Sequence, residues 1–165
     1  MPRSLGYSIS DSFTDRQKSV IREEMRSLSD IVNVTFHEGR TDLRHVRIET
    51  QSIDGRDKVL GEATSMCWTN ATLTLDRADT WSLRPGGRQL QNFLHELGHV
   101  LGLGHTNEDR LSSVMQSNLT WSSKYAATGF LAYDIALAQK IWGASRTSDG
   151  DNEYALKDGV VGGKK

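Results

Sequence analysis

The chain has 165 residues, 36% of them hydrophobic and 25% charged, a composition typical of one folded globular domain rather than a fibrous or disordered chain. Its 20 basic and 21 acidic residues give a formal net charge of -1, which argues against nucleic acid and anionic membranes as partners. No apolar stretch approaches the roughly 20 residues needed to cross a bilayer, so we expect no transmembrane helix.

The first part of the chain predicts a strand, a helix and two further strands. Apolar and polar residues alternate in 5–10 and predict the first strand. Apolar residues recur at helical spacing from Asp15 to about Leu28, and Thr14 or Asp15 can cap that helix. The β-branched stretch 31–36 and the alternation in 42–50 predict the next two strands.

The second part predicts one more strand and two helices. Residues 71–76 alternate again as a strand, and Pro85-Gly-Gly then breaks the chain. A third helix is expected to begin near Asp134 and to end at Gly143. The tail 146–165 offers little core and is expected to be weakly anchored. The second helix follows the break, and its buried face is predicted to be Leu90, Phe93, Leu94, Leu97, Val100 and Leu101.

Residues 95–105 read His-Glu-Leu-Gly-His-Val-Leu-Gly-Leu-Gly-His and predict a metal centre. His95 and His99 lie four residues apart on a helix, so their imidazoles project from one face. A continuing helix would carry His105 to another face, so the chain must turn at Gly102 or Gly104, which tolerate a positive φ. Three imidazoles leave an open position on tetrahedral zinc, as in catalytic rather than structural sites.

Glu96 is the predicted general base. It neighbours His95 and can reach a water activated by the zinc without itself binding the metal. The same carboxyl group can then return the proton to the departing amine, so hydrolysis of a peptide bond needs no Ser or Cys nucleophile.

This extended motif resembles that of the metzincin metallopeptidases, and its surroundings are most similar to the serralysin and matrixin branches. The likeness covers most of the chain, including 30–49 and the segment 134–143. It implies an α+β fold with a mixed twisted sheet, a long helix, an active-site helix and a C-terminal helix, forming a catalytic domain over 1–145. It also implies that Met115, in a Ser-Val-Met-Gln sequence, forms an apolar floor beneath the imidazoles.

The resemblance also implies where a peptide substrate binds. Strand 71–76 would edge the cleft and pair with an extended peptide, so that Ala71, Thr72, Leu73 and Thr74 are candidate substrate contacts. Trp121 and Tyr125 follow Met115 where the family builds its specificity pocket.

Two features depart from the serralysin pattern. Ser117 stands where serralysins have a tyrosine that binds zinc, so we predict three protein ligands, as in matrixins. The calcium repeats of serralysins are absent, and no acidic cluster, whether Asp54, Asp57, Asp76, Asp79 or 149–153, has a calcium-loop spacing, so these residues are expected to be solvated. His37 and His45 are likewise expected to be solvated, and the single cysteine, Cys67, has no assigned role.

The sequence thus predicts a zinc endopeptidase with one catalytic Zn²⁺ and a protein or peptide substrate. The alternative is a zinc-stabilised module that binds a peptide or assembles without turnover. The N-terminus shows no secretory signal, so we expect export by a non-classical route or a place in a larger particle or effector, rather than a housekeeping cytoplasmic role.

Overall fold

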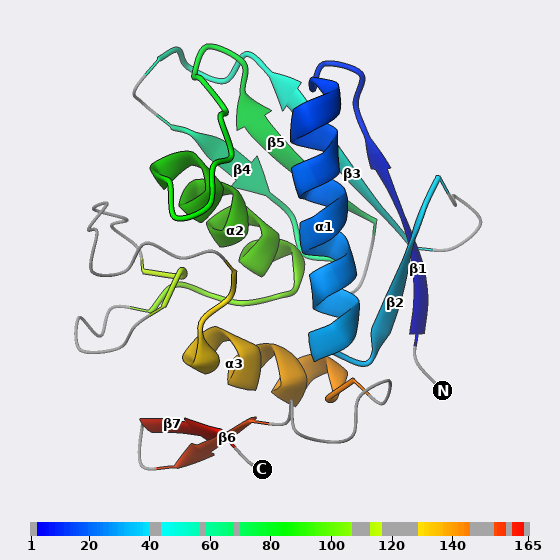
Figure 1. Ribbon diagram of the computed structural model, residues 1–165, viewed down its shortest axis with the longest axis vertical. Coiled ribbons are helices and arrows are strands. Elements are labelled where there is room, and N and C mark those ends of the chain that lie inside the picture. The colour runs from blue at the N-terminus through cyan, green and yellow to red at the C-terminus, as the bar shows by residue number, and fades with distance from the viewer. Residues whose placement is uncertain are drawn as a thin grey trace.

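The computed structural model describes residues 3–39, 44–56, 59–67, 70–106, 113–116, 129–145, 154–157 and 160–163. Its elements in chain order are β1 (Arg3–Ile9), α1 (Asp15–Ile31), β2 (Val34–Glu38), β3 (His45–Gln51), β4 (Gly61–Ala63), β5 (Ala71–Asp76), α2 (Arg88–Val100), α3 (Ala132–Trp142), β6 (Tyr154–Lys157) and β7 (Val160–Gly163). Helices α1 and α2 lie in front of a five-stranded sheet in Figure 1, and α3 lies at its lower end. This is the predicted α+β architecture.

Helix α1 begins with a capping box. Thr14 Oγ1 accepts a hydrogen bond from the Gln17 N–H at 3.2 Å, and Gln17 Oε1 accepts one from the Thr14 N–H at 2.8 Å. The helix buries Ile21, Met25 and Leu28, as its spacing predicted. It continues to Ile31, so the strand expected from residue 31 begins only at Val34; packing outweighs the weak preference of β-branched residues for strands.

The sheet is mixed, with strand order β2-β1-β3-β5-β4. The first four strands run parallel, and β4 pairs antiparallel to β5. On β3, Val46 and Ile48 are fully buried under the helices, whereas Arg47 is exposed on the opposite face, which confirms the predicted alternation.

Strand β5 has its predicted bounds, but it is not the strand at the edge of the cleft that the family resemblance implied. Strand β4 covers it: the Asp76 N–H donates to Leu60 O at 2.8 Å, and the Thr64 N–H donates to Thr72 O at 3.0 Å. The edge strand beside β5 is therefore β4, whose three residues are too few to show an alternating pattern in the sequence.

The carboxylate of Asp76 is fully buried at the end of β5 and organises the loops beside it. Oδ1 accepts from the Ala78 N–H at 2.9 Å, and Oδ2 accepts from the N–H groups of Asp54 and Gly55 at 3.2 and 3.1 Å. These bonds, that from Ala78 foremost, lower the pKa of Asp76. The expectation of a solvated Asp76 is therefore wrong.

Asp76→Asn is expected to lower the thermal midpoint at neutral pH, because an amide nitrogen would face N–H groups that need an acceptor. The pKa of Asp76 is lowered by folding, so its stabilising effect is present above the unfolded value of about 3.9 and is lost as pH falls through the folded value. The difference between the thermal midpoints of the two proteins should therefore begin to shrink only below about pH 4 and should vanish below the lowered folded pKa. Asp11→Asn is the control, because Asp11 is an exposed partner of Lys18; an equal effect at Asp11 would contradict the assignment.

The C-terminal part contains α3 and a pair of antiparallel strands, β6 and β7. Gly143 ends α3 with a φ of +85°, as predicted. The Trp142 indole N–H donates to Leu101 O at 2.8 Å and ties α3 to the end of α2. The strands β6 and β7 lie beside α3 and were not predicted, and the domain boundary at residue 145 stays a prediction. None of the described helices has the length and apolar character that crossing a membrane requires.

Candidate metal centre

Helix α2 supplies two of the three predicted ligands. Its buried residues Leu90, Phe93, Leu94, Leu97 and Val100 fix the helix against the core, as predicted. His95 is buried and His99 is half-buried on the same helix, so both side chains are held by an element that packing makes rigid.

A turn at Gly102 brings the third histidine back. Gly102 has a φ of +93°, and a Cβ there would lie 2.6 Å from Cys67 Sγ, so both conformation and space require glycine. The Gly102 N–H donates to His99 O at 2.9 Å and the Leu103 N–H to Gly98 O at 2.9 Å. Gly104 has no positive φ and is surrounded by open space, so the turn depends on Gly102 alone of the two candidates.

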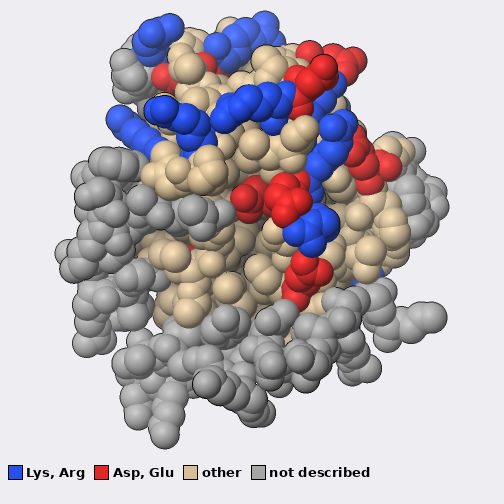
Figure 2. Space-filling view, in the orientation of Figure 1, with Lys and Arg blue, Asp and Glu red and all other residues tan. Residues whose placement is uncertain are grey.

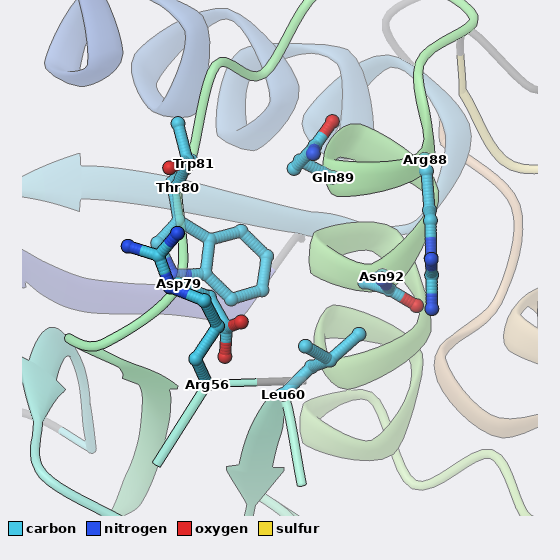
Figure 3. A pocket seen from close by; sticks show the side chains of 8 residues that line it. All are labelled: Arg56, Leu60, Asp79, Thr80, Trp81, Arg88, Gln89 and Asn92. Carbon is cyan, nitrogen blue, oxygen red and sulfur yellow. The ribbon is translucent and has the colours of Figure 1, made fainter. Parts of the chain in front are cut away.

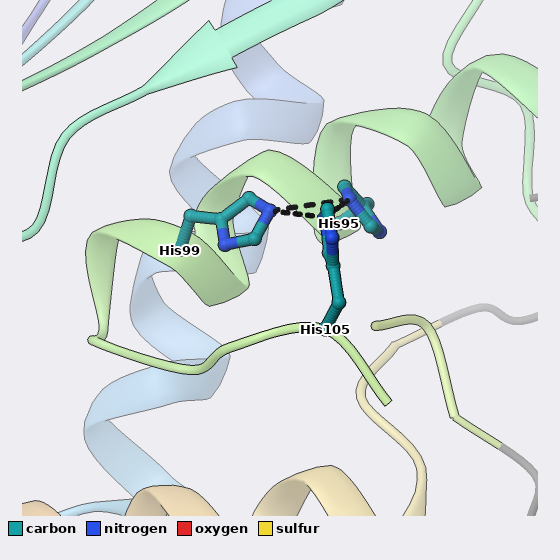
Figure 4. A group of neighbouring side chains, drawn as sticks. All are labelled: His95, His99 and His105. Atoms are coloured by element: carbon teal, nitrogen blue, oxygen red, sulfur yellow. Dashed lines mark hydrogen bonds between the residues drawn. The ribbon is translucent and has the colours of Figure 1, made fainter. Parts of the chain in front are cut away.

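The three imidazoles converge through their Nε2 atoms (Figure 4). The Nε2 atoms of His95 and His99 are 3.2 Å apart, and that of His105 lies 3.2 and 3.1 Å from them respectively. Tetrahedral zinc with Zn–N distances of about 2.0–2.1 Å puts two nitrogen ligands roughly 3.3 Å apart. The triangle therefore fits one zinc ion.

Backbone carbonyls set the tautomers of two of these histidines. His95 Nδ1 lies 2.6 Å from Val114 O and His99 Nδ1 lies 2.9 Å from Leu103 O. Because a carbonyl only accepts, each Nδ1 carries the hydrogen and each Nε2 keeps a lone pair. The two lone pairs face each other at 3.2 Å, which a cation between them would stabilise.

The electrostatics of the triad also suit a metal. Burial foremost, with a smaller contribution from the neighbouring His99 and His105, lowers the pKa of His95 to about 4, against the opposing effect of the hydrogen bond to Val114 O. Burial likewise lowers the pKa of His99. Both imidazoles are therefore neutral at pH 7, the form that binds metal.

Glu96 is half-buried on α2 beside His95 and packs against the edge strand. A Cβ at Gly61 of β4 would lie 2.9 Å from Glu96 Cγ, so the glycine provides the space for this side chain. Burial raises the pKa of Glu96 to about 7, with a smaller contribution from the negative charge of Glu62.

Met115 is buried against α2 on the side of Gly98. The segment that contains Met115 pairs with the residue that follows the third histidine. The Thr106 N–H donates a hydrogen bond to Met115 O at 2.8 Å, and Thr106 and Gln116 form an isolated parallel bridge. The preceding residue, Val114, accepts the bond from His95. Met115 therefore belongs to a turn that contacts two of the ligand-bearing segments.

Sequence reasoning missed the role of Asp134, which is fully buried on α3. Its carboxylate accepts from Ser113 Oγ at 2.5 Å and from the N–H groups of Val114 and Leu131 at 3.1 Å each. It thus links α3 to the turn whose carbonyl orients His95. An acidic residue in the first turn of a helix was the available signal, but it indicates only a cap.

Gly98→Ala is expected to destabilise the protein, because the new Cβ would overlap Sδ of the buried Met115, whose side chain would have to shift. Overpacking of this kind costs about 1–3 kcal/mol, or roughly 2–12 °C in the thermal midpoint of a chain this size. Gly104→Ala is the matched control and should melt like wild type, since nothing lies within 4 Å of its added Cβ. Equal midpoints for the two variants would contradict the close packing of Met115.

The other sequence candidates lie away from the triad or outside the described residues. Trp121 and Tyr125 are outside the described residues, as are Asp57 and Ser117. Ala71, Thr72, Leu73 and Thr74 lie on β5, with β4 between them and the sheet edge. His45 Nε2 lies 2.9 Å from Ser8 Oγ, on β3. Among the described residues, the histidine triad is the group of three or more ligand side chains that can hold a metal ion.

Comparison with known families agrees with this geometry. The model of the matrixin family matches residues 2–143, which include the whole sheet, α2 and α3. No curated protein matches the chain. The chain therefore belongs to the matrixin family and is a zinc-dependent metallopeptidase.

Proposed function

We propose that the protein is an endopeptidase that cleaves extended peptides, with His95, His99 and His105 holding one catalytic zinc ion. The observation that carries the proposal is the convergence of three Nε2 atoms at 3.1–3.2 Å beside a half-buried glutamate. Bound zinc would supply a Lewis acid that polarises the peptide carbonyl and lowers the pKa of water.

Glu96 acts as the general base in this proposal. Its carboxylate accepts the proton of the attacking water and returns it to the amine nitrogen that leaves. Gly61 leaves room for the side chain and burial raises its pKa to about 7, so the group can both take and give a proton near neutral pH.

The edge of β4 is the proposed binding site for the peptide main chain. Leu60 O and the Thr64 N–H face β5, and alternation along an antiparallel strand turns the main-chain groups of Gly61 and Ala63 to the open side. An extended peptide can add there as a further strand through main-chain hydrogen bonds, which tolerate many sequences. The template is thus β4 in place of β5.

The zinc-stabilised binding module is the less favoured alternative. The burial that raises the pKa of Glu96 costs stability. A structural zinc site has no use for such a carboxyl group beside its ligands, whereas a catalytic site needs one as its base. We also propose the three-ligand site of matrixins over the four-ligand site of serralysins; the serralysin likeness stays a prediction.

The test is digestion of an unfolded protein by the purified, zinc-quantified chain, with the products read by mass spectrometry. We expect cuts at internal bonds, abolished by a chelator and restored by one equivalent of zinc. Products trimmed only from the ends would contradict endopeptidase action. A zinc-loaded chain that binds unfolded protein without cutting it would favour the binding module.

A further inference from the structure

A pocket of 220 Å³ lies next to the proposed peptide site, where β4 and α2 both begin (Figure 3). Leu60, at its base, directly precedes β4. Gln89, Asn92 and Arg88 come from α2, and Arg56 and Trp81 come from the two loops that face it. The pocket therefore lies further along β4 and α2, on the N-terminal side of Gly61 and Glu96.

The pocket carries positive charge. Arg56 and Arg88 are both exposed, and among the described residues neither forms an ion pair. Asp79 also lines the pocket and offsets one of these two positive charges, which leaves the pocket with a net positive charge. A neighbouring cavity of 440 Å³ shares Asp79 and Trp81 with it and adds Arg77.

The charge extends over the surrounding surface. Figure 2 shows Lys and Arg side chains in a band across the upper part of the molecule, although the chain as a whole has a net charge of -1. Positive potential concentrated in a hollow attracts anionic groups and disfavours cationic ones.

The distances match a peptide subsite. Along α2, Asn92 lies about 6 Å and Arg88 about 12 Å from Glu96, at 1.5 Å per helical residue. An extended peptide advances roughly 3.3 Å per residue, so it reaches the pocket two to four residues beyond the peptide bond that is cleaved next to Glu96. A peptide antiparallel to β4, the more stable pairing, has its carboxyl end on this side.

We propose that this pocket selects substrates with an acidic residue two to four positions on the carboxyl side of the cleaved bond, through Arg56 and Arg88. The inference rests on the proposed peptidase function and adds a substrate class to it. Arg56 and Arg88 are specificity residues here and take no part in bond cleavage.

The experiment uses one peptide that the wild-type chain cuts at a single bond, remade with Glu, Gln or Lys at each of these three positions. We expect kcat/KM for the best Glu peptide to exceed that of its Gln counterpart about five-fold, as for two partly exposed ion pairs, and the Lys peptide to be the poorest. The preference should shrink as salt is raised. Glu placed at equal distances on the amino side should give no gain.

Arg56→Gln/Arg88→Gln should abolish the Glu preference, so that the Glu and Gln peptides are cleaved with equal kcat/KM. Arg84→Gln is the matched control, since Arg84 is exposed on the loop before α2 but does not line the pocket, and it should keep the preference. Equal wild-type rates for Glu and Gln peptides, or a preference that survives in the double variant, would overturn the inference.

Binding separates this inference from the proposed function. Zinc-loaded Glu96→Ala, with fluorescently labelled Glu and Gln peptides, reports affinity by anisotropy without turnover. If wild type cuts neither peptide, the peptidase proposal fails, while a Glu preference in binding that the double arginine substitution removes still supports the acidic subsite. Equal affinity for both peptides overturns the subsite even if both are cleaved.

Discussion

Glu96→Gln is expected to lower kcat by about 10²–10⁴-fold while the protein keeps one zinc ion per chain. Glutamine has the size of glutamate, so it retains the packing of the side chain against Gly61. It cannot take up a proton from the attacking water, so under the proposed mechanism the chemical step loses its base. Steady-state rates on a fluorogenic peptide, with zinc measured by atomic absorption, check both halves of the prediction.

Glu62→Gln is the control for Glu96→Gln. Glu62 is an exposed carboxylate on β4 that raises the pKa of Glu96 from a distance, and its own side chain lies on the strand face opposite Gly61. Its substitution should change kcat by less than about ten-fold, because it removes a neighbouring charge and no reacting group. Activity of Glu96→Gln within ten-fold of wild type, with zinc bound, would show that another group serves as base.

The local part of the metal centre could be predicted from the sequence, because its geometry depends on short-range spacing. His95 and His99 are four residues apart on a helix, and Gly102 has the positive φ that returns the chain toward them. Each of these relations lies within eleven consecutive residues, so the geometry of the motif can be predicted from the motif alone.

The supporting contacts could not be predicted, because they join segments far apart in the chain. Gly61 makes room for Glu96 only because β4 pairs with β5 beside α2. Asp134 orients the turn at Val114 across 20 residues of sequence. In the sequence, a glycine in a polar stretch and an aspartate near a helix start have ordinary local explanations, and only the tertiary fold gives them a role at the site.

The error about which strand edges the cleft has the same origin. Strand β5 shows a clear alternating pattern and β4 has only three residues, so the sequence predicts the first and misses the second. The position of an edge depends on which strand lies last in the sheet. Because one unpredicted strand changes that order, the proposed peptide template moves from Ala71–Thr74 to Gly61 and Ala63.

His105→Ala is expected to remove zinc binding while leaving the apo fold close to wild type. His105 is exposed, and the described contacts of its ring are with the other two predicted ligands, His95 and His99. His95, by contrast, is buried and bonded to Val114 O, so its removal would also leave a carbonyl without its donor. Substitution at position 105 therefore tests the contribution of zinc binding to stability separately from the packing of the fold.

The measurement is the thermal midpoint with and without zinc. At a zinc concentration 100 times Kd, a ligand that binds only the folded state stabilises it by about 2.7 kcal/mol, or roughly 5–11 °C for a chain this size. Wild type should show this rise, and His37→Ala should show it too, since His37 lies on β2 and is outside the triad. The His105→Ala midpoint should not respond to zinc. A full zinc-dependent rise in this variant would mean that two imidazoles with another ligand hold the metal, and the three-histidine centre would be wrong.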